Sequence, residues 1–280
     1  MQETIRLSNG FLMPRIALGT YGLSKDEAYD VVSRALAFGY RHIETAPIYL
    51  NEDALGKAIK DSGIPREDLF VTSKIPPHIK TYEGTLRVAR RSMDALGVSY
   101  LDALLINNPV PWGKEGEDHT EGNRAVWRAL EALHDEEAVA SIGVSHFDVP
   151  DLEAIIETAR VMPVINQIGV FVGHPLDDIR AFCEDRNITI QGHSPYARGR
   201  LLTYGPLLEK AARHGMTPAG LALSYVLSKG VFPVVKATSD AHLRENLEAA
   251  NNLPEDLIRR LDAINHDVRD YLPPGAKWVL

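Results

Sequence analysis

The chain has 280 residues, of which 45% are hydrophobic and 24% charged, a composition typical of globular proteins rather than disordered ones. Its 30 basic and 38 acidic side chains give a net charge of −8, which opposes non-specific binding to nucleic acid or to an anionic membrane. A single cysteine, Cys183, excludes an internal disulfide, and no apolar stretch approaches the ~18 residues that span a bilayer. We therefore expect a cytoplasmic protein.

The predicted elements alternate between strands and helices along the chain. A hairpin is predicted around Asn9-Gly10, followed by a helix that begins at a capping box formed by Ser24 and Glu27. A later helix is predicted to begin at Thr217-Pro218, an N-cap followed by proline at the first helical position. Eight short apolar runs predict strands at 15–19, 41–45, 69–73, 101–106, 139–145, 163–168, 188–192 and 231–236.

The pattern within the strands indicates the fold class. The runs rarely alternate apolar with polar residues, which is typical of parallel strands buried on both faces. Eight strand and helix units favour a closed (β/α)8 TIM barrel over an open doubly wound sheet, whose GxGxxG fingerprint is absent after every predicted strand. No linker or composition break divides the chain. We predict an α/β fold in which residues 1–280 form one barrel domain with an N-terminal hairpin.

Polar side chains gather where the predicted strands end, which is where barrels of this kind carry their active sites. Glu44 and Lys74 end two strands, and Tyr49 lies in the loop that follows the first of them. A neighbouring cation lowers the cost of ionising a tyrosine, whose free pKa is about 10. These residues therefore predict a proton-donating site. Zinc, hydrolase and nucleotide-triphosphatase chemistry are not indicated, since the sequence contains no HExxH pair, GxSxG elbow or P-loop.

Several long segments, in the right order, resemble the aldo-keto reductase family: ETAPIYLNE, TSKI, YLDALLINNP, GHSPYARGRLL and VVKATSDAHLRENL. The resemblance implies a barrel that holds a nicotinamide dinucleotide without a Rossmann domain and reduces a carbonyl group by hydride transfer. Tyr49 matches the general acid of the family, and Lys74 matches the lysine beside it. Glu44 occupies the place of an aspartate, and Asn107 that of a histidine that orients the substrate oxygen.

Those two replacements bear on the reaction. Glu44 is one methylene longer than aspartate, and Asn107 can donate a hydrogen bond but cannot titrate near neutral pH. Losing a donor aimed at a developing oxyanion slows reactions substantially, so we expect slow reduction of ordinary ketones. One hypothesis is that the substrate is a small carbonyl compound or a cyclic imine. A cyclic imine needs less acid catalysis, because it is already protonated as an iminium, which Glu44 attracts. The alternative is a regulatory or redox-sensing nucleotide-binding barrel with vestigial activity, like the channel-associated β subunits of the family.

The same resemblance implies a cofactor site, with NADPH expected and NADH also usable, and no metal. The residues matched to it are Ser145, His146 and Gln167 at the carboxamide, His193 in the slot of a tyrosine that stacks on the nicotinamide, Ser194 through Leu201 at the pyrophosphate, Lys236 and His242 at the adenosine 2′-phosphate, and Glu245 and Asn246 at the adenine. Tyr21, Asn108 and Trp112 are expected in the substrate pocket, under loops near 20–24, 108–122 and 267–280. The expected partner is a small-molecule substrate, and the expected assembly a monomer or weak dimer.

Overall fold

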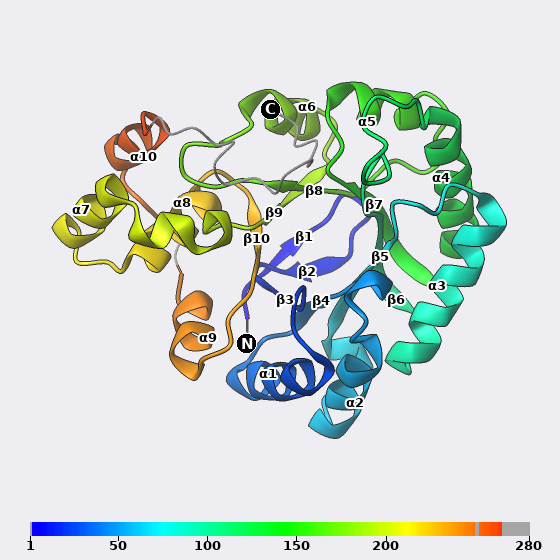
Figure 1. Cartoon of the computed structure of the whole chain (residues 1–280), viewed down its shortest axis with the longest axis horizontal. Helices are drawn as coiled ribbons and strands as arrows, with labels where there is room; N and C mark the ends of the chain where they lie inside the picture. The colour runs from blue at the N-terminus through cyan, green and yellow to red at the C-terminus, as the bar shows by residue number, and fades with distance from the viewer. Residues whose placement is uncertain (1, 250–251, 265–280) are drawn as a thin grey trace.

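Eight parallel strands close into a barrel that is surrounded by helices (Figure 1). The computed structural model describes residues 2–249 and 252–264. Around the barrel the strands follow the order β10-β3-β4-β5-β6-β7-β8-β9, so each strand pairs with its neighbours in the chain and the last pairs with the first. The strands are β3 Ala17–Gly19, β4 His42–Glu44, β5 Phe70–Ile75, β6 Leu101–Ile106, β7 Val139–Ser145, β8 Ile165–Gly169, β9 Thr189–His193 and β10 Phe232–Val235. The predicted (β/α)8 barrel is confirmed.

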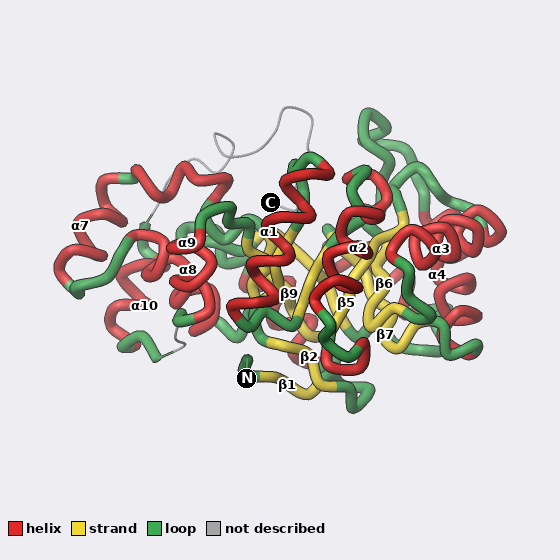
Figure 2. Tube along the Cα trace, turned by 90° about the horizontal axis from the view of Figure 1, so that it is seen from below, coloured by secondary structure: helices red, strands yellow, loops and turns green. Residues whose placement is uncertain are grey.

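An antiparallel hairpin covers one end of the barrel, seen at the bottom of Figure 2. Its strands are β1 Thr4–Arg6 and β2 Leu12–Pro14, and Gly10 in the turn has a φ of 92°, which favours glycine. Met13 of the hairpin is fully buried with Phe70 and Leu105 of the barrel strands. The hairpin therefore seals the end of the barrel opposite the carboxyl ends of the strands.

The helices lie outside the strands, and two of them begin where the sequence signals predict. The capping box of Ser24 and Glu27 is formed at the start of α1, and Thr217 caps α8. The helices are α1 Lys25–Phe38, α2 Glu52–Ser62, α3 Tyr82–Leu96, α4 Thr120–Asp135, α5 Val149–Ile156, α6 Asp177–Asp185, α7 Gly205–Arg213, α8 Pro218–Ser228, α9 Asp240–Leu247 and α10 Glu255–Asp262, with the 3-10 turns η1 Pro47–Tyr49, η2 Arg66–Asp68 and η3 Ala197–Thr203. No helix within the described residues is long and apolar enough to cross a bilayer.

Each barrel strand sends alternate side chains to the interior and to the helices. In β5, Val71 and Ile75 join the apolar core shared with the helices, whereas Phe70 packs with the hairpin inside the barrel. Two and four residues after Phe70, Thr72 and Lys74 therefore face the interior as well, with Lys74 at the end remote from the hairpin. The strand is longer than the predicted run 69–73, and this extra length places Lys74 on regular, rigid backbone.

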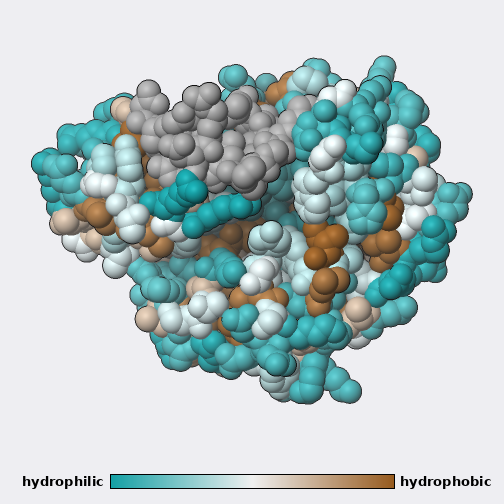
Figure 3. Space-filling model, in the orientation of Figure 1, coloured by the Kyte–Doolittle hydropathy of each residue, from teal (hydrophilic) through white to brown (hydrophobic). Residues whose placement is uncertain are grey.

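The carboxyl ends of the strands open on the face seen in Figure 1. The space-filling view of this face has a hollow near its middle, with apolar side chains beside it (Figure 3). The loops predicted to border the substrate at 20–24 and 108–122 are described by the structure, whereas the third, 267–280, lies outside the described residues.

Candidate active site

The loop that carries Tyr49 is fixed by a buried asparagine that sequence reasoning missed. Tyr49 ends the turn η1 directly after β4, and Leu50 takes a left-handed conformation with a φ of 58°. Asn51, fully buried, donates through Nδ2 to the carbonyl oxygens of Thr20 at 3.0 Å and Leu23 at 3.1 Å. The loop after β4 is thereby tied to the loop after β3. Asn51 belongs to the segment ETAPIYLNE, whose polar end was a usable signal.

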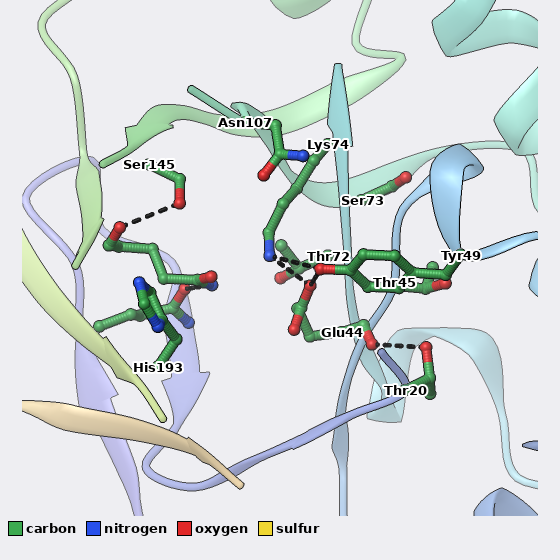
Figure 4. A network of polar contacts seen from close by, with 12 residues as sticks. Thr20, Glu44, Thr45, Tyr49, Thr72, Ser73, Lys74, Asn107, Ser145 and His193 are labelled. Carbon is green, nitrogen blue, oxygen red and sulfur yellow. Dashed lines mark hydrogen bonds and ion pairs between the residues drawn. The ribbon is translucent and has the colours of Figure 1, made fainter. Parts of the chain in front are cut away.

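Tyr49, Lys74 and Glu44 converge at the mouth of the barrel (Figure 4). Lys74 Nζ lies 2.6 Å from Glu44 Oε1 and donates to the Tyr49 hydroxyl at 3.1 Å. The same hydroxyl donates to Glu44 Oε1 at 3.3 Å. The ammonium and carboxylate are each 3% exposed, so their interaction is shielded from bulk water. The three predicted residues are thus within hydrogen-bonding distance of one another.

The acidity of the phenol is governed by burial and by Glu44. Burial, followed by the negative charge of Glu44 and the hydrogen bond to it, raises the pKa of Tyr49 well above its usual value of 10.0. The prediction from Lys74 alone had the opposite direction and is wrong for the free protein. Burial is the main reason, and Glu44 adds to it, because its carboxylate oxygen reaches the hydroxyl as well as the ammonium.

Asn107 follows β6 at the same end of the barrel and is 5% exposed. Its backbone N–H donates to the carbonyl oxygen of Ile75 at 3.0 Å, which continues the pairing of β5 with β6 by one residue. In Figure 4 its side chain lies beside the stem of Lys74. The neighbouring Asn108 uses its side-chain oxygen to accept from the Val110 N–H at 3.1 Å, an interaction that shapes the loop toward Trp112.

A second group of predicted residues lies across the mouth, on β7, β8 and β9. Ser145 and Gln167 are register partners, and the Ser145 hydroxyl donates to the Gln167 carbonyl oxygen at 2.9 Å. His146 and His193 place their ring centres 4.6 Å apart. Burial lowers the pKa of His146 to about 4 and holds that of His193 well below its usual range, so both imidazoles are neutral at pH 7.

The residues predicted at the pyrophosphate and the adenosine lie after β9, in η3, after β10 and in α9. Exposed Lys236 places its Nζ 3.4 Å from the Gly22 carbonyl oxygen, beside the loop after β3. Ser194 has a left-handed φ of 53°, Leu201 is fully buried in η3, and His242 donates its backbone N–H to Ser239 at the start of α9. Glu245 accepts from the Thr217 hydroxyl, and Asn246 accepts from the Tyr196 hydroxyl at 2.6 Å.

Exposed apolar side chains stand on the loops around Tyr49. Tyr21 is 62% exposed, and its ring lies edge-on to that of Tyr49 at 5.2 Å between centres. Trp112, in the loop after β6, is 61% exposed, and Leu50, which the sequence analysis did not single out, is 76% exposed. Leu50 could have been recognised as a candidate from the sequence, because it lies between Tyr49 and Asn51, which make the polar contacts of this loop.

Comparison with known proteins agrees with this geometry. The family model described as the aldo/keto reductase family matches residues 15–266. The chain is 34% identical to the glyoxal reductase of Bacillus subtilis over 271 residues, covering 96% of this chain and 95% of that protein.

Solved structures match the fold as well. An aldo/keto reductase from Brucella melitensis superposes with a TM-score of 0.86 at 34% identity, covering 94% of this chain and 97% of that one. A Bombyx mori aldo-keto reductase, solved in complex with NADP, superposes with a TM-score of 0.86 at 26% identity, covering 96% and 95%. The chain therefore belongs to the aldo-keto reductase family and is an NAD(P)H-dependent oxidoreductase of that type.

Proposed function

We propose that the protein reduces small carbonyl compounds with NADPH, with Tyr49 as the proton donor. The observation that carries the proposal is the placement of the Tyr49 hydroxyl at the mouth of the barrel, 3.1 Å from Lys74 Nζ, with the Lys74–Glu44 ion pair behind it. A buried, hydrogen-bonded group of this composition is what general acid catalysis requires. Glyoxal reductase activity in a relative of this length supports a small carbonyl substrate.

The residues across the mouth fit a nicotinamide cofactor. Ser145 and Gln167 present a hydroxyl and an amide on adjacent strands, which suits a carboxamide, and the neutral ring of His193 offers a stacking surface. At the other end, a Cβ added to Gly22 would meet Lys236 Nζ at 3.4 Å, so bare backbone keeps room beside this ammonium for a phosphate. When bound, the cofactor supplies the hydride.

Within this site, each protein group has a separate task. Tyr49 gives its proton to the substrate oxygen as negative charge develops there, and Lys74 stabilises the phenolate that remains. Glu44 fixes the position of the Lys74 ammonium at 2.6 Å. Asn107 provides a hydrogen-bond donor toward the substrate oxygen, without titrating. Tyr21, Trp112 and Asn108 border the bound substrate.

A cyclic imine is a second candidate substrate, favoured by one contact. Glu44 Oε1 lies 3.3 Å from the Tyr49 hydroxyl, so negative charge extends to the position where the substrate heteroatom binds. An iminium ion already carries its proton and is attracted by this charge, whereas a neutral ketone needs the weakened acid of Tyr49. The alternative of a regulatory barrel with vestigial activity has no comparable support, since the relatives named above are reductases.

We propose that residues 1–280 act as one domain, and that the protein works in the cytoplasm as a monomer or weak dimer with no nucleic acid or membrane partner. The net charge of −8 supports the absence of nucleic acid partners. Sedimentation of the purified protein over a range of concentrations tests the assembly.

Turnover of NADPH tests the proposed function. The decrease in NADPH absorbance is followed with a panel of dicarbonyls, aldehydes, ketones and cyclic imines, for the wild type and Tyr49→Phe. We expect turnover by the wild type and loss of at least two powers of ten in the variant, because the proton donor is removed. Tight NADPH binding without turnover of any substrate would overturn the proposal and favour the regulatory alternative.

A further inference from the structure

The loop after β6 has three consecutive backbone carbonyl groups, each held by a side chain from a different part of the chain. In the segment Asn107–Pro109, the first carbonyl oxygen accepts from His146 Nδ1 at 2.9 Å. The second accepts from Lys80 Nζ at 2.9 Å, and the third from Asn123 Nδ2 at 3.0 Å. A loop normally leaves such carbonyls to water, so three side-chain donors in a row indicate a backbone that is held in one conformation.

Lys80 and Asn123 act together in this arrangement. Lys80 lies in the loop after β5, and its Nζ also donates to Asn123 Oδ1 at 2.5 Å. Asn123 is 5% exposed in the first turn of α4. The amide of Asn123 therefore accepts from the ammonium on one side and donates to the loop on the other. We call these two residues the loop clamp.

Lys80 is a charged residue at a partly buried position. Burial lowers its pKa to about 7, and the negative charge of Asp151 on α5 opposes that change only in part. No carboxylate within the described residues forms an ion pair with it at 4.0 Å or less. A partly buried amine without a paired carboxylate loses hydration, and the hydrogen bonds that Lys80 makes to the loop and to Asn123 offset this cost.

We propose that Lys80 and Asn123 are positioning residues that hold Asn107 in its productive orientation for reduction. This inference rests on the proposed function, because it assigns a purpose to the segment that carries the substrate-orienting amide. Asparagine has a short side chain whose reach is set almost entirely by its backbone. A misplacement of about 1 Å can cost up to a hundredfold in rate. Pairing with β5 and the contact with His146 hold the backbone of Asn107 itself, and the loop clamp holds the carbonyl groups of the two residues that follow it.

Kinetics of Lys80→Met test the proposal. This variant keeps the apolar stem and removes the donor. We expect kcat for an aldehyde or dicarbonyl to fall about tenfold, with a smaller change in KM, while the dissociation constant of NADPH, measured by fluorescence titration, stays the same. Lys60→Met, at an exposed position of α2, is the matched control and is expected to behave like the wild type.

A double-mutant cycle separates positioning from general stability. In an Asn107→Ala background, Lys80→Met should lower kcat by less than about threefold, because the amide that it positions is gone. The proposal would be overturned if Lys80→Met lowered kcat equally in the wild-type and Asn107→Ala backgrounds, or if it did not lower kcat in the wild-type background. If Lys80→Met fails to fold, Asn123→Asp replaces it in the cycle, since this near-isosteric change keeps an acceptor for Lys80, now charged, and turns the donor to the Pro109 carbonyl oxygen into an oxygen that repels it. A wild type without turnover would refute the proposed function itself, whereas an active wild type with an unaffected Lys80→Met refutes only the loop clamp.

Discussion

Shortening Glu44 tests how the site controls its proton. In the free protein the Tyr49 hydroxyl donates to Glu44 Oε1 at 3.3 Å, so the carboxylate holds the proton that the substrate has to receive. Glu44→Asp removes one methylene and draws the carboxylate back by about 1.5 Å. We expect the Lys74 ammonium to stay within hydrogen-bonding distance of the Tyr49 hydroxyl, while the contact of the carboxylate with the phenol is lost.

The size of the effect follows from Coulomb's law. At 3.3 Å, and with an effective dielectric constant of about 20, a carboxylate opposes a phenolate by about 5 kcal/mol. At about 4.8 Å the opposition is about 3.5 kcal/mol. The difference of about 1.5 kcal/mol makes the phenol about tenfold more acidic in the variant. The general acid is strengthened, and we expect kcat for a small aldehyde at pH 7 to rise, by at most about tenfold.

The assay is the pH dependence of NADPH turnover. The active form of Tyr49 carries its proton, so activity falls as pH rises through the pKa of the phenol, and a raised pKa moves this fall to higher pH. In Glu44→Asp the fall should begin at lower pH than in the wild type, whereas Glu67→Asp, on the surface, should leave it unchanged. A fall at the same or a higher pH in Glu44→Asp would show that Glu44 does not oppose ionisation of Tyr49.

Three further changes have defined outcomes. Asn107→His restores a ring donor beside Tyr49 and should raise kcat/KM for ketones by about tenfold or more, whereas an unchanged rate would mean that the asparagine already fills this role. Lys236→Met should weaken NADPH binding about tenfold or more and leave NADH binding unchanged, because only the former carries the 2′-phosphate; equal losses in titrations of both would contradict this assignment. His42, fully buried between Pro14 and Thr72, has its pKa lowered by burial from 6.5 to about 4. As pH falls, the unfolded state binds a proton at His42 before the folded state does, so the folded state is about 3 kcal/mol less stable near pH 4 than above about pH 6.5. We expect the free energy of unfolding of His42→Gln, measured with denaturant, to change less with pH between these values than that of the wild type. An identical pH dependence in the two proteins would refute this assignment.

The placement of the site on strand ends could be predicted because it depends on rules local to each strand. Side chains alternate along a strand, and in a barrel the carboxyl ends meet at one mouth. Lys74 and Ser145 therefore come to the same mouth although they lie far apart in the sequence. The hydrogen bond that joins Lys74 to Tyr49 follows from this convergence together with the short turn η1.

Contacts between loops could not be predicted, because they depend on where separate loops lie in space. The donation from Asn51 to the loop after β3 and the contact of Lys80 with the loop after β6 both join segments that no local pattern relates. The acidity of Tyr49 escaped prediction for a similar reason. The direction of the shift in its pKa depends first on the burial of the phenol and then on its contact with Glu44, and the sequence shows neither.

The two departures from the family pattern act on the reaction in the same direction. The contact with Glu44 adds to the effect of burial in making Tyr49 a weaker acid, and Asn107 supplies a donor that cannot release a proton near neutral pH. Both changes weaken proton donation to a neutral carbonyl oxygen, while the negative charge of Glu44 lies next to the Tyr49 hydroxyl. A substrate that already carries its own proton is affected least by this loss of acid catalysis. We therefore propose that these two residues together favour cyclic iminium ions over ketones, and we expect the double variant Glu44→Asp, Asn107→His to shift the preference toward the ketone.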